Sequence, residues 1–493
     1  MPAQPLTDER GTFDARARDA RDLRRGFVAN LSGYAARLSL PVLNLLVIRQ
    51  YGAELFGEFA IAQASLVGVW RFGSLGLDKA ALWWVPRRQD ASHALWSMLF
   101  WIVLANGLLA ALIVAFLAPA LAEWSGARGS VLALRWMALG LVPTAILELT
   151  IHAVMGARNM AVRAFVRDGF VPALQVITAL GASLLGWRQV GLPLSFVVSV
   201  AAGALVASWM ARGSFGPVGS LASLWRLPLP VLRYAGPIWL SELLSTLVGR
   251  LDVYALARLS DARSVGIYAA ASQLAGSLRA VRQSFDPIVL SLCSELSARG
   301  DRARLVAGFS RATAMVVLIQ VPLWAAIFCF DEWLMRLFGA DFSAGANALW
   351  ILASCWALNG VLGLNGIVLL GYGRSGWTLL GLLLTSLVMW GALSGCIPRW
   401  GLAGAALAVT LAYTLLSAGL AWLAYHVART PLYDRGVQRL LGLASLGVVC
   451  MLGAWFALGS SGGALQRAGA FSVFLLVSGL AYARWRGQRR GAA

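Results

Sequence analysis

The sequence is dominated by apolar runs about as long as a membrane-spanning helix. These runs recur from Phe27 to Arg484, and Arg-bearing or Gly/Pro-bearing breaks separate them. A bilayer core about 30 Å thick is crossed by roughly 20 residues of helix, and no polar stretch is long enough to form a separate soluble domain. Only 13% of the residues are charged, about half the usual share of soluble proteins. The pattern predicts an all-α polytopic membrane protein and excludes an ordinary soluble enzyme.

We expect about 14 transmembrane helices. Their predicted spans are 28–48, 56–77, 93–117, 131–153, 166–186, 191–211, 235–257, 265–287, 308–330, 347–370, 377–397, 402–425, 438–458 and 466–484.

Positive charge is distributed unevenly over the breaks between these spans. When alternate breaks are assigned to opposite sides, one side with both termini carries 27 Arg and Lys residues and the other carries 8. Cytoplasmic loops of membrane proteins are enriched in Arg and Lys, so both termini are predicted to face the cytoplasm. The net charge of +19 is explained by this bias, and no nucleic-acid partner is expected. The first 26 residues are predicted to form an uncleaved, basic cytoplasmic tail.

Several classes of chemistry lack their usual sequence signals. The longest outer loop spans only about 15 residues near 331–345, which leaves little room for an extramembrane catalytic domain. The three His residues are scattered, and the five Cys residues form no CxxC pair. We therefore expect no enzymatic activity, no catalytic residues, no bound metal and no cofactor.

An internal repeat divides the chain. Residues 49–62 align without gaps on residues 258–271, an offset of 209, and both copies follow the first helix of their half. Two related six-helix bundles follow from this spacing, and transporters with internal repeats bind substrate between the repeats near the bilayer midplane. The predicted organisation is a tail at 1–26, an N-terminal bundle at 27–212, a cytoplasmic linker at 213–233, a C-terminal bundle at 234–428, and two additional helices with a cytoplasmic tail at 429–493.

The same motifs resemble a known family. The pattern Arg-x-x-Gly-Ala-x-x-x-Gly-x-Phe-Ala at Arg49, its repeat at Arg258, the turn at 370–374, and the segments 284–287 and 295–300 resemble the polysaccharide transporter family. That family contains the Wzx-type O-antigen and exopolysaccharide flippases, and its superfamily includes the lipid II flippase and the MATE multidrug exporters. The resemblance implies a location in the bacterial inner membrane and a lipid-linked oligosaccharide as substrate. It also implies contact with membrane lipids and, as further candidate partners, a polysaccharide polymerase and export machinery.

Polar stripes on the apolar helices supply the candidate site. Arg residues at membrane depth are costly and normally face a cavity or a partner, and guanidinium groups bind phosphate oxygens through paired hydrogen bonds. If the first two helices of each half line the central cleft, as the resemblance implies, their Arg side chains would bind the diphosphate of a polyprenyl carrier. The predicted diphosphate- and sugar-binding residues are Arg37, Arg279, Arg71, Arg250, Arg282, Asn30, Tyr34, Asn44 and Gln63.

Each of the less central Arg residues also has a structural alternative. For Arg282 the alternatives are an ion pair with Asp286 and contact with lipid phosphate near the cytoplasmic end of its helix, and for Arg71 they are a pair with Asp78 and contact with the membrane surface. Arg250 has Glu242 or Asp252 as alternative partners.

Candidate groups for coupling transport to H⁺ or Na⁺ are fewer. Glu148 and His152 lie one helical turn apart and could relay a proton or anchor their helix as a hydrogen-bonded pair. Glu242 and Asp252 complete the coupling candidates, although Asp252 also suits a structural ion pair.

These observations predict a flippase that moves a polyprenyl-diphosphate-linked oligosaccharide from the cytoplasmic to the outer leaflet by alternating access. One alternative is a MATE-like, cation-coupled exporter of small molecules, which would need acidic residues in its chamber. The other is a membrane enzyme of polysaccharide assembly.

Overall fold

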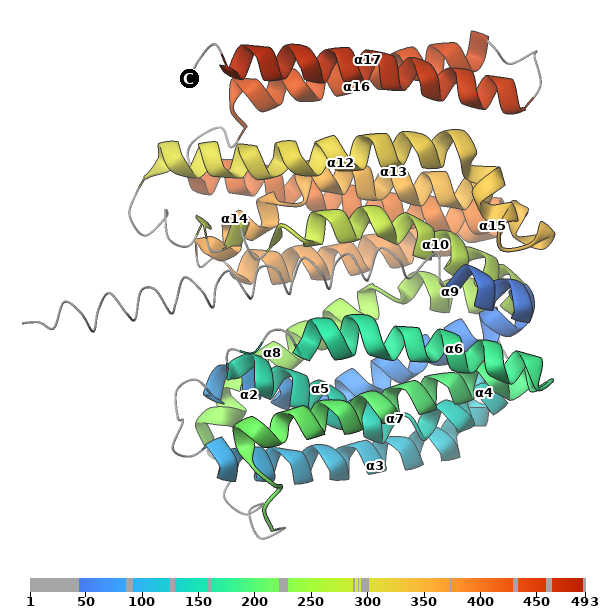
Figure 1. Cartoon of the computed structure of the whole chain (residues 1–493), viewed down its shortest axis with the longest axis vertical. Coiled ribbons are helices and arrows are strands. Elements are labelled where there is room, and N and C mark those ends of the chain that lie inside the picture. The colour runs from blue at the N-terminus through green and yellow to red at the C-terminus, as the bar shows by residue number, and fades with distance from the viewer. Residues whose placement is uncertain are drawn as a thin grey trace, which may run out of the picture.

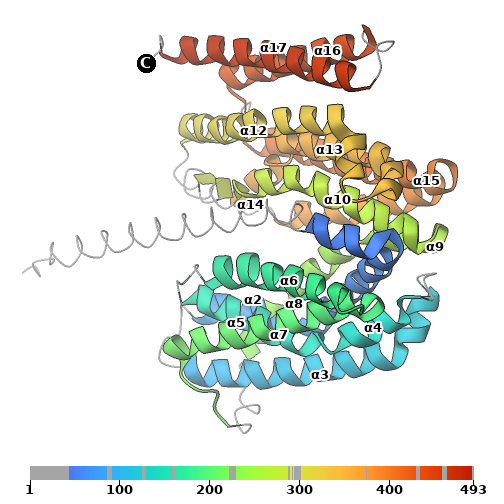
Figure 2. The same cartoon turned by 45° about the vertical axis from the view of Figure 1, so that its right-hand side comes forward.

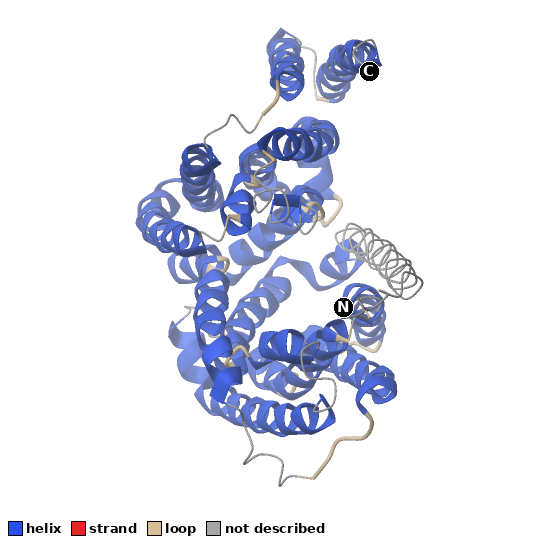
Figure 3. Ribbon diagram, turned by 90° about the vertical axis from the view of Figure 1, so that its left-hand side faces the viewer, coloured by secondary structure: helices blue, strands red, loops and turns tan. Residues whose placement is uncertain are grey.

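A computed structural model describes residues 44–85, 92–124, 129–157, 159, 162–220, 229–286, 289–290, 292–293, 301–372, 375–428, 433–457 and 463–490. Within these ranges every regular element is a helix (Figure 3). The all-α prediction is confirmed.

The first half of the chain forms one bundle, which lies in the lower part of Figure 1. Its first described helix, residues 44–74, bends at Gly52, where φ is +81°. The helices that follow are α2 (Leu77–Trp84), α3 (Ser92–Trp124), α4 (Ser130–Ala138), α5 (Leu141–Gly156), the π-helix η3 (Arg163–Phe170), α6 (Val171–Leu184) and α7 (Arg188–Phe215). Their buried apolar side chains form one continuous core.

The second half forms another bundle above the first, and a helical pair lies at its far side (Figures 1 and 2). Its helices are α8 (Leu229–Val248), α9 (Leu251–Leu259), α10 (Ala262–Gln283), α12 (Arg302–Arg336), the 3₁₀-helix η5 (Ala340–Gly345), α13 (Ala346–Leu362), α14 (Asn365–Gly371) and α15 (Ser375–Ala428); the pair is α16 (Arg435–Ala457) and α17 (Ala464–Arg490). A separate core joins α9, α10, α13 and α15, and the bend and second part of the 44–74 helix also contribute to it.

Helix α8 departs from this division. Figures 1 and 2 show it beside the first bundle, and Ala235 belongs to the first bundle's core. The helix is interrupted between α8 and α9 at Gly249 and Arg250. Arg250 has non-helical backbone angles, with φ at −130° and ψ at 0°. The predicted seventh span is therefore a broken helix whose first part packs on the N-terminal bundle.

The helices agree closely with the predicted spans. Each predicted span from 56–77 onward overlaps a helix of the structure, and spans 377–397 and 402–425 are the two parts of α15. α15 breaks at Gly401, whose φ of 52° and ψ of −124° suit a residue without a side chain. Six described helices are individually long and apolar enough to cross a membrane, or seven when the bent pair α4 and α5 counts as one span. The chain is a polytopic membrane protein.

Two ends of the molecule matter below. The inner end is where α2 ends and α3 begins, and the charge distribution predicts that it faces the cytoplasm. The outer end is where α3 ends and α4 begins.

Candidate functional site

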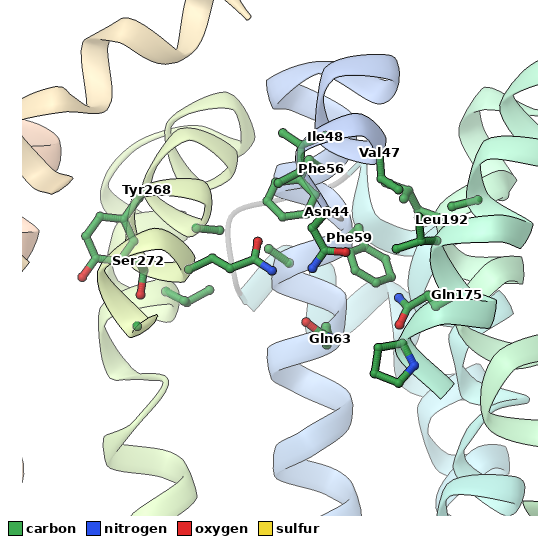
Figure 4. A pocket seen from close by; sticks show the side chains of 18 of the residues that line it. Asn44, Val47, Ile48, Phe56, Phe59, Gln63, Gln175, Leu192, Tyr268 and Ser272 are labelled. Carbon is green, nitrogen blue, oxygen red and sulfur yellow. The ribbon is translucent and has the colours of Figure 1, made fainter. Parts of the chain in front are cut away.

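A cavity of about 510 Å³ lies between the two bundles. In Figure 4, Tyr268 and Ser272 of α10 lie on one side and Gln175 of α6 and Leu192 of α7 on the other. The helix of residues 44–74 lies between these two sides in the view and contributes Asn44 to the lining. The cavity therefore occupies the position where the internal repeat predicts a substrate site.

The polar lining of this cavity is basic and neutral. Arg250 and Arg279 are the charged residues among its described lining, and that lining contains no Asp or Glu. The other polar members are Asn44, Gln63, Gln175, Ser195, Tyr268, Ser272, Gln273, Ser277 and Gln283. A chamber with this composition favours an anion and offers amide and hydroxyl groups to neutral polar parts of a ligand.

Arg279 is held against an aromatic ring. Its guanidinium carbon lies 4.8 Å from the ring centroid of Trp356 on α13, within the range of a cation–π contact. Such a contact orients the planar guanidinium while leaving its N–H groups available for an anion. Arg279 is thus a positioned cation in the cavity wall.

Arg250 reaches the cavity from the break between α8 and α9. Its backbone N–H donates to the carbonyl of Leu247, and its own carbonyl accepts from the N–H of Tyr254. These two hydrogen bonds satisfy the backbone groups of Arg250 at the break, and the residue lines the wall of the cavity. Of the predicted binding residues, Arg250, Arg279, Asn44 and Gln63 are brought together here.

Three predicted residues of the first helix, Asn30, Tyr34 and Arg37, lie outside the described residues.

Arg71 does not line the cavity. At the inner end its guanidinium lies 3.6 Å from the Asp78 carboxylate and 3.3 Å from the Glu242 carboxylate of α8. The indole N–H of Trp239 on α8 also donates to the carbonyl of Arg71, at 3.0 Å. Arg71 therefore joins the first bundle to α8, and Glu242 is its partner rather than that of Arg250.

Arg282 is also paired. Its Nη1 atom donates to Asp286 Oδ1 at 2.9 Å, one helical turn further along the chain. The ion pair with Asp286, one of the structural alternatives for this residue, is therefore present in the structure.

The candidate coupling residues lie in two separate places. Glu148 Oε1 is 2.9 Å from Arg167 Nε, and His152 Nε2 is 2.8 Å from Lys79 Nζ, both at the inner end. Asp252 accepts a hydrogen bond from the Tyr268 hydroxyl at 2.9 Å, behind the cavity wall. Among the described side chains, no group of three or more His, Cys, Asp or Glu is placed to hold a metal ion.

Sequence reasoning missed most of the neutral polar lining. Ser272, Gln273, Ser277 and Gln283 on α10 share a face with Arg279, and all five line the cavity. Successive residues of this set lie one, four, two and four positions apart, which places them on one broad face of the helix that could have been found from the sequence. Gln175 on α6 gives a weaker signal, because it is a single amide in an apolar helix.

The fold resembles those of known membrane transporters. The structure titled "Lipid II flippase MurJ, inward closed conformation" aligns over 93% of this chain and 97% of its own, with a TM-score of 0.70 and 14% identity. An inward-facing multidrug resistance MATE family transporter of the MOP superfamily aligns over 80% and 98%, with a TM-score of 0.67 and 14% identity. A mutant of the Vibrio cholerae MATE transporter VcmN aligns over 84% and 98%, with a TM-score of 0.58 and 18% identity.

None of the curated proteins matches this sequence. The family model described as "Polysaccharide biosynthesis protein" matches residues 49–344, more than half of the chain. The resemblance drawn from the sequence motifs is thereby confirmed, and the chain belongs to the polysaccharide biosynthesis protein family.

Proposed function

We propose that this protein is a flippase that carries a polyprenyl-diphosphate-linked oligosaccharide from the cytoplasmic to the outer leaflet of the bacterial inner membrane. The product would supply a surface or secreted polysaccharide. The observation that carries the proposal is the cavity wall, in which Arg250 and Arg279 are accompanied by amides and hydroxyls and, among the described lining, by no carboxylate.

The charge of the cavity suits the diphosphate. Guanidinium groups bind phosphate oxygens through charge-assisted hydrogen bonds, and removal of bulk water strengthens that attraction. Gln175 and Gln273 are placed to hydrogen-bond sugar hydroxyls. The polyprenyl tail would remain in the bilayer while the headgroup crosses through the cavity by alternating access.

The MATE-like alternative shares the fold but fits this wall less well. An exporter of cationic compounds needs a carboxylate that faces its substrate or its coupling ion. Asp252, which lies near the cavity, is engaged by the Tyr268 hydroxyl. The family match to polysaccharide biosynthesis also favours a glycolipid over a drug.

The test is a flipping assay with the full-length protein in proteoliposomes. A polyprenyl-diphosphate glycolipid with a fluorescent sugar is incorporated, and a membrane-impermeant reductant bleaches the outer leaflet only. The expected result is bleaching of nearly all fluorescence with the protein and about half without it. Protection of the inner-leaflet fraction in protein-containing vesicles would refute the proposal.

Variants make this assay specific for the cavity. Arg250→Ala and Arg279→Ala should each slow flipping by roughly 10- to 100-fold, because each removes a hydrogen-bonding charge worth about 1.5–3 kcal/mol. The matched control is Arg399→Ala, an exposed Arg at the break in α15 outside the cavity. The wild type and the three variants should all flip a glycolipid without the diphosphate at the same slow rate.

A further inference from the structure

A second hollow lies on the outside of the first bundle, between α3, α5 and α7. It is a groove of about 690 Å³, and its described lining extends from Leu139 and Val197 to Arg212 and Val218. Figures 1 and 2 show α3 at the edge of the first bundle farthest from the second bundle. The groove shares no described lining residue with the central cavity. We call it the α3–α7 groove.

The α3–α7 groove faces the lipid. α3 and α7 are both long and apolar enough to cross a membrane. Leu139 and Leu205 line the groove, and their side chains are 58% and 73% exposed. An empty groove in hydrocarbon would deprive its lining atoms of dispersion contacts. In the bilayer, the natural occupant of such a groove is an acyl chain.

The groove is as long as a complete acyl chain requires. Val197 and Arg212 lie 15 positions apart on α7, which corresponds to about 22 Å of helix. One leaflet contributes only about 15 Å of the hydrocarbon core. A chain that starts beside Arg212 can therefore follow the groove through its whole leaflet.

The inner end of the groove is closed by the segment that follows α7. The backbone N–H of Gly219 donates to Ser97 Oγ at 2.7 Å, and the carbonyl of Gly219 accepts from the indole N–H of Trp101 at 2.9 Å. The rings of Trp96 and Phe215 stack with their centroids 5.3 Å apart. These contacts fix the end of α7 against the beginning of α3. The groove therefore has a built wall at the level where a lipid headgroup begins, and Trp is common at that level.

Arg212 supplies the charge at this end of the groove. It is the charged residue of the described lining, which contains no Asp or Glu. Its side chain is exposed, and no described residue forms an ion pair or a side-chain hydrogen bond with its guanidinium. The inner end is predicted to face the cytoplasm, and basic pockets between membrane helices on that side bind anionic headgroups.

Two other grooves on the lipid-facing surface differ from this one in charge. One lies between α12 and the pair α16–α17, and the other lies along the two parts of α15. Their described lining contains no charged residue. They can accommodate apolar chains but offer no anchor for a phosphate group.

We propose that the α3–α7 groove is a binding site for an anionic phospholipid of the cytoplasmic leaflet, with one acyl chain along α7 and the headgroup phosphate at Arg212. The guanidinium can donate two hydrogen bonds to phosphate oxygens. Ser208 lies one helical turn before Arg212, lines the groove, and offers a hydroxyl to the polar part of the lipid. A zwitterionic headgroup fits less well, because its ammonium group would be repelled by Arg212.

The test locates the lipid by photocrosslinking. Full-length protein is placed in nanodiscs of phosphatidylcholine that contain a small fraction of phosphatidylglycerol with a diazirine in one acyl chain. After irradiation, adducts are mapped by mass spectrometry of peptides. Adducts should concentrate on the parts of α5 and α7 that line the groove. Unlabelled phosphatidylglycerol should compete about fivefold better than added phosphatidylcholine, as expected for one cation near the membrane surface.

Three variants make the test specific. Arg212→Ala should lower the adduct yield in the groove about fivefold, because it removes that cation. Ala201→Phe should also lower it, because the ring fills the groove at a half-buried position while Arg212 remains. Arg302→Ala is the matched control, since Arg302 is an exposed Arg at the start of α12 and does not line the groove. It should label like the wild type.

Adducts spread evenly over the lipid-facing helices, an unchanged yield in Arg212→Ala, or equal competition by phosphatidylcholine would each overturn the inference. Suppression by a polyprenyl diphosphate at lower concentration than by phosphatidylglycerol would assign the groove to the transported glycolipid instead. If Ala201→Phe does not fold, Arg212→Ala and the lipid competition still decide the matter. Because no transport is measured, the result is independent of the flippase proposal.

Discussion

Gly57 and Gly266 pack backbone against backbone at the outer end of the cleft. A Cβ atom on Gly57 would collide with the carbonyl of Ala262 and lie 2.9 Å from the Gly266 nitrogen. A Cβ atom on Gly266 would collide with the carbonyl of Ala53 and lie 2.9 Å from the Gly57 nitrogen. The contact is reciprocal, and the two glycines are separated by 209 residues, the offset of the internal repeat. The two copies of the repeat thus contact each other across the two halves.

Gly57→Ala or Gly266→Ala should force the outer ends of the two bundles apart. The added methyl group meets backbone atoms, which cannot move independently of their helices. We expect flipping to fall by roughly 10-fold or more, equivalent to about 1.4 kcal/mol or more against the closed state. The measurement is labelling of Ser272→Cys in the cavity by a membrane-impermeant maleimide added from outside, which should become faster.

The control for this prediction is Gly181→Ala in α6, because a Cβ atom there has no neighbour within 4 Å. It should flip and label like the wild type. Unchanged labelling and transport in both Gly57→Ala and Gly266→Ala would mean that this contact does not close the outer end.

The internal repeat predicted part of the fold but not the contact between its two copies. It predicted two related halves and aligned Gly57 with Gly266, but a repeat does not state that its copies touch each other. Arg250, Arg279, Asn44 and Gln63 were predicted because polar groups stand out on apolar helices, and they line one cavity. The division of the chain into the predicted domains stays a prediction.

The pairing of Arg71 with Glu242 was harder to predict. The two residues are 171 positions apart, and their contact depends on the first part of α8 packing against the first bundle. No helical periodicity carries that information, because it arises from the break at Gly249 and Arg250. Local spacing did name Asp286 as a partner of Arg282, since both lie on one helical face.

The Arg282–Asp286 pair should affect stability rather than transport. Their side chains are 14% and 31% exposed, and neither residue lines the cavity. Arg282→Ala should lower the free energy of unfolding by about 1–3 kcal/mol, because it leaves a partly buried carboxylate without its donor. Thermal unfolding in detergent measures this loss, while the flipping rate per folded molecule should stay unchanged.

The double variant Arg282→Leu/Asp286→Leu should recover much of the lost stability, since replacing both partners avoids an unpaired charge. A severe loss of flipping in Arg282→Ala at unchanged thermal stability would instead assign this Arg to the substrate.

Asp261 caps α10, the helix that supplies one wall of the cavity. Its carboxylate accepts the backbone N–H of Ser264 at 2.8 Å. Hydrogen bonds from Ser264 hold the pKa of Asp261 below its ordinary value of 3.8. Because the pKa of Asp261 is lower in the folded state than in the unfolded state, the ionised carboxylate contributes fully to stability above the unfolded-state pKa. This contribution is lost as pH falls through the folded-state pKa. Asp261→Ala should cost about 1 kcal/mol at pH 7.

Thermal unfolding of the wild type, Asp261→Ala and Asp261→Asn at several pH values tests the direction of this pH dependence. Asn keeps an acceptor oxygen but cannot ionise, so Asp261→Asn should retain most of the stability at neutral pH. The difference between the wild type and Asp261→Ala should shrink as the pH approaches about 3. A difference that grows with acidity would contradict the role of the ionised carboxylate.

Arg279 and Trp356 should act as a unit on the headgroup. The indole ring 4.8 Å from the guanidinium carbon orients a planar cation that presents several N–H groups to the cavity. Arg279→Lys keeps the charge but loses the planar fork that matches two phosphate oxygens, so it should slow flipping nearly as much as Arg279→Ala. Trp356→Leu should slow flipping by roughly 2- to 30-fold, because a cation–π contact is worth about 0.5–2 kcal/mol.

A double variant shows whether Trp356 acts by orienting Arg279 or only by filling space. If Trp356 works by orienting Arg279, then Trp356→Leu should cost little once Arg279→Ala is present, and the two losses will not add. Fully additive losses in the flipping assay would show that the ring contributes packing alone. Because a diphosphate requires two adjacent oxygens to be bound in a fixed geometry, non-additivity is the result expected of a site built for that group rather than for a single negative charge.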